Sequence, residues 1–392
     1  MPPKFNKRSL AAGVALSGLM LTLGVGASAS GDGGRAGSSQ ATAQQVNPDG
    51  YTSARVCGEC HRDIYESWKG SLHAFSLTDP IFDTAYMQAV RQEGDQARVI
   101  CLRCHAPMTM FNGDYMLEEG VTREGVSCDF CHTVTAVHLD GRDQPFETVP
   151  GIIKRSTIEV TDSPAHEVAY SELHASAEFC GGCHNFVSPA GAAVLTTYDE
   201  WRDGPYAAQG IPCQSCHMAL SPGRVAEHPS SSGSGFNLHR LIRDTDQLRS
   251  ALTVEVTRGT RAAGVVDVEV AIENVGSGHM APTGMPTREV VLTVIAEGPA
   301  RSQTSARRYG KVVADSDGTV LETDVDVLLR GALILNDTRI APGERRVERM
   351  SFRGLGDGQV TLVAALSYEY APAILTVQRM NIKLAEAERI IR

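Results

Sequence analysis

The sequence predicts a mixed fold, in which a mainly α-helical and irregular region is followed by an antiparallel, Ig-like β-sandwich. Two observations support this prediction. All 10 cysteines of the 392-residue chain lie between Cys57 and Cys216, among short helical patterns separated by loops. From Leu252 onward the chain has no cysteine, and apolar residues alternate with polar ones, as in strands that bury one face.

The first residues have the pattern of a secretory signal peptide. Lys4, Lys7 and Arg8 precede an apolar run from Leu10 to Val25, and Ala27-Ser28-Ala29 is a small-residue cleavage signal. We therefore predict cleavage after Ala29 and a periplasmic or secreted protein. The alternative is an uncleaved anchor, although the run is short for a span of about 20 residues. No other stretch predicts a membrane span. Residues 30–50, rich in Gly, Ser, Ala and Gln, predict a flexible linker.

Every cysteine belongs to a Cys-x-x-Cys pair that a histidine follows directly. The five motifs are Cys57/Cys60/His61, Cys101/Cys104/His105, Cys128/Cys131/His132, Cys180/Cys183/His184 and Cys213/Cys216/His217. This motif is typical of covalent haem c attachment, in which the two thiols hold the porphyrin and the imidazole binds the iron. Zinc ribbons, thioredoxin-like centres and disulfide frameworks are the alternatives, but none of them needs a histidine after each pair. We predict five covalently attached haems.

The haem region is predicted to span residues 51–245. So few residues for each macrocycle favour short helices and loops around stacked porphyrins. Helical spacing is found at Asp63–Gly70 and Pro80–Gln92, and a Ser-Pro cap begins a predicted helix over Pro164–Phe179.

The predicted β-sandwich spans residues 246–380. Its clearest strands are Val265–Ile272, Arg288–Ala296 and Gln359–Tyr370, separated by clusters of Gly, Pro and Asn. The tail, residues 381–392, is predicted to be helical.

The sixth ligand of each iron decides whether that haem carries electrons or binds a substrate. Seven histidines lie outside the motifs. Five of them are the candidates for distal iron ligands: His73, His166, His174, His239 and His279. The other two, His138 and His228, are predicted to be surface residues.

The segments CGECHRDIYESWKGSLHA, CLRCHAPM, GVSCDFCHTV, SPAHEVAYSELHASAEFCGGCHN and CQSCHM resemble the cytochrome c-554-like group of multihaem cytochromes c. That group is similar in haem stacking to hydroxylamine oxidoreductase and pentahaem nitrite reductase. The resemblance covers about residues 50–240, and its Trp-x-x-Ser-x-His element implies that His73 is a distal ligand. Tetrahaem members of the group have one haem fewer, and the Cys-x-x-Cys-Lys motif of pentahaem nitrite reductases is absent here.

The segment NVGSGHMAPTGMPTRE, residues 274–289, resembles the Gly-His-x-x-Pro-Thr-Gly segment of β domains attached to such cytochromes. The resemblance implies that His279 binds an iron. In that case the β domain caps one haem and fixes how the two regions meet.

The net charge of −10 becomes −13 when residues 1–29, with three positive and no negative charges, are removed. This charge argues against nucleic acid or anionic lipid as a partner. We expect an exported pentahaem cytochrome c that transfers electrons between redox partners, either other cytochromes or a membrane quinol-linked complex, through closely packed and mostly bis-histidine haems.

The alternative is a multihaem oxidoreductase that acts on a small nitrogen or sulfur compound at one five-coordinate haem. Catalytic residues remain unassigned, although Glu118, Glu119, Arg123 and His138 could supply acid–base groups. A third hypothesis is that the β domain docks the cytochrome onto a larger assembly.

Overall fold

The computed structural model describes residues 45–159, 163–228, 235–241, 245–375 and 379–392. The predicted signal peptide (1–29) and most of the predicted linker (30–50) lie outside the described residues. Within the described ranges, no helix combines the length and the apolar character that a bilayer span requires.

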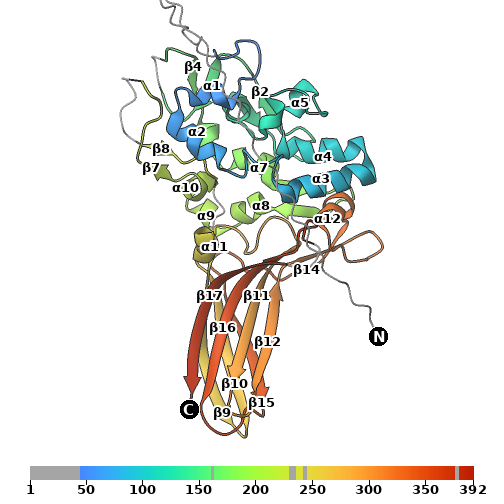
Figure 1. Ribbon diagram of the computed structural model, residues 1–392, viewed down its shortest axis with the longest axis vertical. Coiled ribbons are helices and arrows are strands. Elements are labelled where there is room, and N and C mark those ends of the chain that lie inside the picture. Colours follow the sequence, from blue (N-terminus) through green and yellow to red (C-terminus); the bar gives the residue numbers. More distant parts are fainter. Residues whose placement is uncertain (1–44, 160–162, 229–234, 242–244, 376–378) are drawn as a thin grey trace, which may run out of the picture. The chain divides into compact units, whose positions relative to one another are not determined.

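The first part of the described chain consists of short helices joined by loops and small hairpins (Figure 1). Its helices are α1 (Ala54–Gly58), α2 (Arg62–Lys69), α3 (Pro80–Glu93), α4 (Asp95–His105), α5 (Thr109–Asn112), η1 (Thr122–Glu124), α6 (Cys128–Thr133), η2 (Glu172–Ala175), α7 (Glu178–His184), α8 (Thr197–Arg202), α9 (Pro205–Ala208), α10 (Cys213–His217) and α11 (Thr245–Ala251). Its strands are β1 (Val134–Val137), β2 (Phe146–Thr148), β3 (Ile153–Ser156), β4 (Glu167–Tyr170), β5 (Asn185–Val187), β6 (Ala193–Thr196), β7 (Leu220–Ser221) and β8 (Phe236–Asn237).

Two of the predicted helices are confirmed. α2 covers the predicted Asp63–Gly70 segment, and α3 covers Pro80–Gln92. The side chain of Asp79 caps α3 by accepting a hydrogen bond from the Ile81 amide, and Pro80 occupies the first turn, where its missing N–H costs nothing.

The predicted helix over Pro164–Phe179 is wrong. That segment contains the strand β4, the single turn η2 and only the beginning of α7. β4 pairs in parallel with β3, and the Ser171 amide donates to the Ser156 carbonyl. Hydrogen bonds to a distant strand therefore override the local helical signal of the Ser-Pro cap.

Each attachment motif lies on or beside a short helix. The second motif ends α4, the third lies within α6, the fourth ends α7 and the fifth forms α10. The first motif begins in α1 and ends directly before α2. In a helix the first cysteine, the second cysteine and the histidine occupy positions i, i+3 and i+4, which share one face. Short helical turns therefore direct all three side chains of a motif toward the same space.

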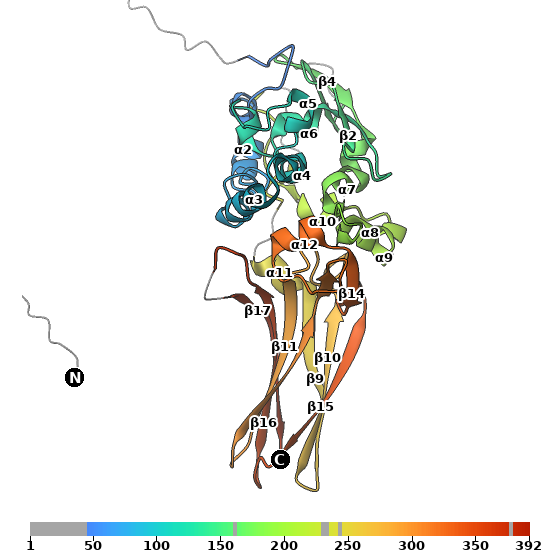
Figure 2. The ribbon, with the colours of Figure 1, turned by 90° about the vertical axis from the view of Figure 1, so that its right-hand side faces the viewer.

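The second part of the described chain is a sandwich of two antiparallel sheets. One sheet has the order β15-β10-β9 and the other β12-β11-β16-β17. Figure 2 shows the two sheets as separate layers. The strands are β9 (Leu252–Ala262), β10 (Val265–Asn274), β11 (Arg288–Glu297), β12 (Ser302–Tyr309), β15 (Arg345–Arg353), β16 (Val360–Tyr370) and β17 (Met380–Ile391), with the hairpin β13 (Lys311–Ala314) and β14 (Leu333–Asp337) and the helix α12 (Asp324–Arg330) inserted.

The apolar residues of both sheets form one core. Leu292 in β11, Leu366 in β16 and Ile272 in β10 are fully buried in it. The three strands predicted from alternating apolar residues, at 265–272, 288–296 and 359–370, are confirmed as β10, β11 and β16.

The predicted helical tail at 381–392 is wrong, because these residues form most of β17, which pairs with β16 along its full length. The register shifts once: Leu366 faces Ala385 and Ser367 faces Lys383, so Leu384 is an extra residue. Before this bulge the even-numbered residues of β17 face the core, and after it the odd-numbered residues do. The apolar residues of the segment therefore do not alternate regularly along the sequence. The Ala- and Glu-rich composition then favours a helix locally, while pairing with β16 determines the actual structure.

The helical part and the sandwich share apolar contacts. Val325 of α12 packs with Ala89 of α3 and Ala97 of α4, and Val313 and Val327 pack with Val194 of β6. Figures 1 and 2 both show α12 between the helices and the long strands. Residues 44–392 thus form one compact unit, and the boundary at 245/246 remains a prediction.

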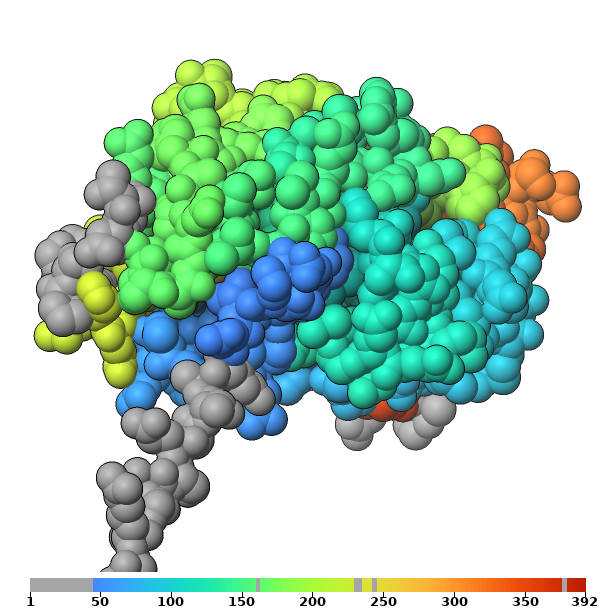
Figure 3. Space-filling model, turned by 90° about the horizontal axis from the view of Figure 1, so that it is seen from above, coloured from blue at the N-terminus to red at the C-terminus, as the bar shows by residue number. Residues whose placement is uncertain are grey.

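Segments far apart in the sequence also meet at the N-terminal end of the described chain. The Tyr51 hydroxyl lies 2.9 Å from Thr148 Oγ1, and the Thr52 amide donates to Asp129 Oδ2 at 2.6 Å. Figure 3 shows the blue segment of these first residues lying between teal and green segments from later in the chain. The beginning of the helical part is thereby fixed next to α6 and its motif.

Candidate functional site

Three motif histidines are oriented as metal ligands usually are. The Nδ1 atom of His61 lies 2.6 Å from the Val225 carbonyl, that of His105 lies 2.9 Å from the Ser76 carbonyl, and that of His132 lies 2.6 Å from the Arg155 carbonyl. A carbonyl only accepts, so Nδ1–H donates and Nε2 is left unprotonated. Hydrogen bonds of this kind commonly orient imidazoles that bind a metal through Nε2.

Burial keeps the imidazoles of several predicted ligands neutral. Together with the charge of neighbouring histidines, it lowers the pKa of His73 to about 3 and the pKa values of His184 and His239 to about 4. The neutral ring is the form that binds iron.

Each of four motif histidines faces a histidine from outside the motifs. The distances between ring centres are 5.9 Å for His61–His166, 6.4 Å for His184–His73, 6.3 Å for His132–His239 and 6.5 Å for His217–His279. A metal with two imidazoles on opposite sides, at bonds of about 2 Å, holds their ring centres roughly 6 Å apart. The structure therefore brings together four of the five predicted distal ligands with four motif histidines.

The fifth predicted distal ligand, His174, also lies near His132, at a ring-centre distance of 5.7 Å. Both of its nitrogens have other partners: Nε2 lies 2.9 Å from the Cys131 carbonyl, and Nδ1 lies 2.9 Å from Ser171 Oγ. His239 differs, because its Nδ1 lies 2.7 Å from the Asn237 carbonyl, and its Nε2 is the nitrogen left to bind a metal. The structure thus gives His132 two neighbouring imidazoles, and only that of His239 has the ligand orientation.

His105 has different surroundings from the other motif histidines. The ring stacked on it belongs to Phe82, with centres 3.7 Å apart and planes inclined by 13°. Burial lowers the pKa of His105, and its Nδ1 donates to the Ser76 carbonyl as described. Among the described ring contacts, His105 therefore stacks on a phenylalanine, whereas the other four motif histidines face a histidine.

The thiols of different motifs also lie next to one another. Interaction with Cys128 of the third motif lowers the pKa of Cys57 of the first, and interaction with Cys180 of the fourth motif lowers that of Cys213 of the fifth. Cys183 of the fourth motif likewise lowers the pKa of Cys104 of the second. All ten cysteines are free thiols in the structure. In the described part of the chain, no three His, Cys, Asp or Glu side chains gather closely enough to hold a metal ion, as a zinc site would require.

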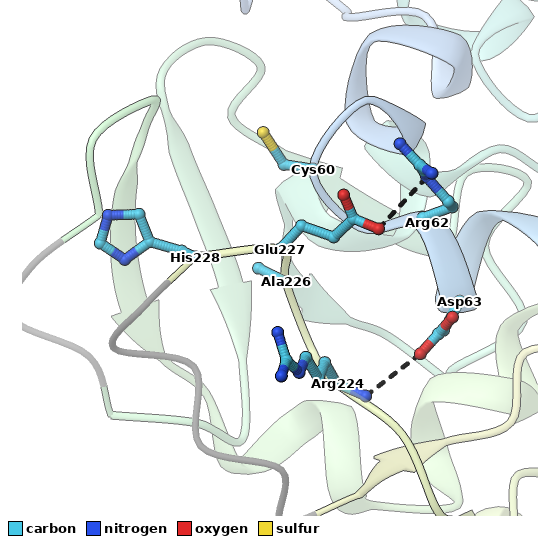
Figure 4. A pocket seen from close by; sticks show the side chains of 7 residues that line it. All are labelled: Cys60, Arg62, Asp63, Arg224, Ala226, Glu227 and His228. Atoms are coloured by element: carbon cyan, nitrogen blue, oxygen red, sulfur yellow. Dashed lines mark hydrogen bonds and ion pairs between the residues drawn. The ribbon is translucent and has the colours of Figure 1, made fainter.

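A cavity of about 550 Å³ lies beside the first motif (Figure 4). Cys60, Arg62 and Asp63 form one side of it, and the segment from Arg224 to His228 forms the other. Arg62 Nε pairs with Glu227 at 3.3 Å, and the Arg224 amide donates to Asp63 at 3.2 Å. Its volume lies within the range of cofactor pockets, next to a cysteine of the attachment motif.

Two buried arginine atoms support the fit of an anionic cofactor. Within the described residues, Nε of Arg103 and Nη1 of Arg155 are buried and have no hydrogen-bond partner. Arg103 lies inside the second motif, and the Arg155 carbonyl accepts the hydrogen bond of His132. Buried donors are normally satisfied, so an acceptor such as a haem propionate fits both atoms. Together with the oriented imidazoles, these donors show that the residues present fit haem.

The remaining sequence candidates do not converge. His138 Nε2 pairs with Glu147 at 2.8 Å in the β1–β2 hairpin. Arg123 instead donates to the carbonyls of Leu117 and Glu118, and the Glu118 and Glu119 amides donate to Asp114. His228 lines the cavity beside the first motif.

The groups that orient the imidazoles were not predicted from the sequence. Most of these are backbone carbonyls, which carry no residue-specific signal. Two buried ion pairs, Asp129–Lys154 and Glu200–Arg339, were not predicted either. Their members are distant in sequence, and only the position of Asp129 inside an attachment motif could have drawn attention to one of them.

Comparisons with known proteins agree with this reading of the motifs. Residues 56–133 match the family described as cytochrome c554 and c-prime. A penta-heme cytochrome c552 from Thermochromatium tepidum matches with a TM-score of 0.70 and 21% identity, over 87% of this chain and 99% of that one. None of the curated proteins compared with the chain matches it.

Other structural matches cover only about a third of the chain. The CARDB domain of the PF1109 protein from Pyrococcus furiosus covers 35% of it and 88% of that domain, with 16% identity and a TM-score of 0.17, too low to indicate a shared fold. The five motifs, the family match at residues 56–133 and the fold shared with the penta-heme cytochrome support a multihaem c-type cytochrome with a C-terminal β domain.

Proposed function

We propose that the chain is an exported pentahaem cytochrome that carries electrons between redox partners, and that most of its irons have two histidine ligands. When bound, each haem supplies a one-electron redox centre whose potential depends on its axial ligands and surroundings. The facing histidine pairs carry this proposal. In this proposal the axial ligands are His61 with His166, His132 with His239, His184 with His73, and His217 with His279.

The contacts between motifs support electron transfer from one haem to the next. The thiol contacts link the first motif to the third, the second to the fourth and the fourth to the fifth. Five attachment points within residues 57–217 leave little protein between neighbouring macrocycles. Such crowding suits a protein that conducts electrons.

Export and the nature of the partners rest on the sequence. The predicted signal peptide and the covalent attachment of haem c, which takes place outside the cytoplasm, both support a periplasmic or secreted location. The net charge of −10 for the whole chain favours a partner with a basic docking surface, such as another cytochrome or a quinol-linked complex.

One observation favours the alternative function, a multihaem oxidoreductase. His105 has Phe82 against its ring, whereas the other four motif histidines each face a histidine. A haem held by Cys101, Cys104 and His105 is therefore the one at which a small nitrogen or sulfur compound would react.

Electron paramagnetic resonance of the purified holoprotein distinguishes the two functions. For a carrier we expect low-spin ferric signals from the four histidine pairs, and no spectral change when nitrite, hydroxylamine or sulfite is added. A high-spin signal that shifts with one of these compounds, accompanied by turnover, would replace the carrier proposal with the oxidoreductase. Cyanide serves as the positive control for an open iron.

Replacing His239 and His174 separately tests the assignment of the third haem. His239→Ala is expected to convert one low-spin haem to high-spin, because the ring that faces His132 is lost. His174→Ala is the matched control and should leave the low-spin count unchanged, because both ring nitrogens of His174 are already hydrogen-bonded. The opposite result would assign His174 as the ligand. The measurement is the spin count of the ferric proteins.

A further inference from the structure

His279 belongs to a short segment that leaves the sandwich and meets the helical part. It follows β10, and its backbone is held on the β side. Its carbonyl accepts hydrogen bonds from Asn274 Nδ2 at 3.0 Å and from Ser277 Oγ at 2.8 Å. Two residues further on, Ala281 exchanges two backbone hydrogen bonds with Ile340. The sandwich therefore fixes one side of this segment.

Glu200 of α8 holds the other side from the helical part. One carboxylate oxygen, Oε2, accepts from the Met280 amide at 3.2 Å and from Thr283 Oγ1 at 2.6 Å. Thr283 Oγ1 also lies 2.9 Å from the Oγ1 atom of Thr197, the first residue of α8. The carboxylate therefore contacts Met280, which directly follows His279, and Thr283, which ends the same segment.

The second carboxylate oxygen is equally occupied. Oε1 accepts from Thr196 Oγ1 at 2.7 Å and from Arg339 Nη1. Arg339 is itself fixed by two hydrogen bonds to Asp337, at 2.8 and 2.7 Å. The side chains of Glu200 and Arg339 are 5% and 6% exposed, so this ion pair is almost completely removed from water.

The charge of Glu200 is retained in spite of its burial. Burial raises the pKa of the carboxyl group, but Arg339 and the two threonine hydroxyls offset this effect and lower the pKa below its ordinary value. A charged carboxylate makes stronger hydrogen bonds than a neutral group. A fixed charged acceptor is well suited to hold a backbone amide and a hydroxyl in one position.

We propose that Glu200 is a positioning residue for His279: by holding Met280 and Thr283, it keeps the His279 ring opposite His217, where it can bind the iron attached at Cys213 and Cys216. The ring centres of His279 and His217 are 6.5 Å apart and their planes differ by 14°. This inference rests on the proposed ligation by His279. In this arrangement the ion pair between Glu200 of the helical part and Arg339 of the β part helps to hold the distal ligand of one iron.

The experiment compares variants of the holoprotein by cyanide titration and by ferric spin state. In Glu200→Ala, His279 is expected to leave the iron more readily, so cyanide should bind one haem more tightly than in the parent protein. We expect a change of about ten- to a hundredfold, the factor by which losing an outer-shell partner typically weakens metal binding. Thr283→Val removes the hydrogen bonds of the Thr283 hydroxyl to Glu200 and Thr197 but leaves the bond from the Met280 amide, so it should show the same change to a smaller extent. Glu200→Gln keeps one oxygen that can accept from Met280 and Thr283, but its NH2 group replaces the acceptor of Thr196 and Arg339, so it should recover only part of the parent behaviour.

Ser188→Ala is the control for a purely structural effect. Ser188 donates to the Gly331 carbonyl across the same junction but does not contact the His279 segment, so cyanide binding should be unchanged. His279→Gly separates the two proposals: it should give one high-spin haem that added imidazole restores. If His279→Gly has no effect, ligation and positioning both fail. If only the Glu200 and Thr283 variants have no effect on cyanide binding, ligation stands and positioning fails.

Discussion

Replacing Cys180 and Cys183 together by serine is expected to remove one haem and to destabilise the helical part by at least the cost of a large core truncation, about 2–5 kcal/mol. Without thiols no thioether bonds form, and the fourth motif has a central position. Cys183 contacts Cys104 and Cys180 contacts Cys213, while His184 faces His73. Loss of this haem therefore leaves apolar surface of three motifs uncovered.

The mass of the mature protein from a host that attaches haem c gives the haem count, and thermal unfolding gives the stability. The matched variant replaces Cys213 and Cys216, of which Cys216 is exposed. It should also lose one haem but keep more of its stability. If the mass of either variant showed as many haems as the parent protein has, covalent attachment at that motif would be contradicted.

Features that depend on neighbouring residues could be predicted from the sequence. The attachment motifs are local, since the spacing i, i+3, i+4 places both cysteines and the histidine on one helical face. The strands β10, β11 and β16 were also predictable, because their apolar and β-branched residues recur at every second position on the core face. In these segments local propensity and tertiary packing favour the same structure.

Predictions failed where distant partners decide the structure. The segment 164–179 has a helical cap signal but pairs with β3, and the residues of β17 favour a helix but extend the sheet of β16. Neither β3 nor the bulge at Leu384 can be inferred from the segment itself. In both cases a helix was predicted where the structure has a strand. Pairing with a distant strand is made by backbone groups, so the amino-acid composition of the segment does not reveal it.

The candidate site shows the same division. The identity of the ten cysteines and five proximal histidines was readable from the motifs. The pairing of distal histidines was not, since His73 faces His184 from a position before the second motif, while His239 faces His132 from far downstream. Distances of 5.9 to 6.5 Å between ring centres depend on the complete fold. The sequence could list the candidate ligands but could not assign them to irons.

Asp129→Ala is expected to destabilise the protein by about 3–5 kcal/mol, the usual cost of breaking a buried ion pair from one side. Asp129 is 1% exposed and lies between the two cysteines of the third motif, and its partner Lys154 of β3 is 11% exposed. Asp129 also accepts from the Thr52 amide at 2.6 Å, and Lys154 donates to the Gly151 carbonyl at 2.6 Å. The substitution thus leaves a buried ammonium group without its counter-ion and a buried amide without its acceptor.

Urea unfolding of the holoprotein provides the measurement, with the exposed pair Arg142–Asp140 as control. Asp140→Ala should cost less than about 1 kcal/mol, because water screens a pair whose side chains are 46% and 57% exposed. Combining Asp129→Leu with Lys154→Met should cost less than Asp129→Ala alone, since no buried charge then remains unpaired. If Asp129→Ala were no more costly than Asp140→Ala, the ion pair would not hold the third motif to β3. If the double variant were the least stable, the packing of apolar side chains at this position, rather than the unpaired charge, would account for the loss.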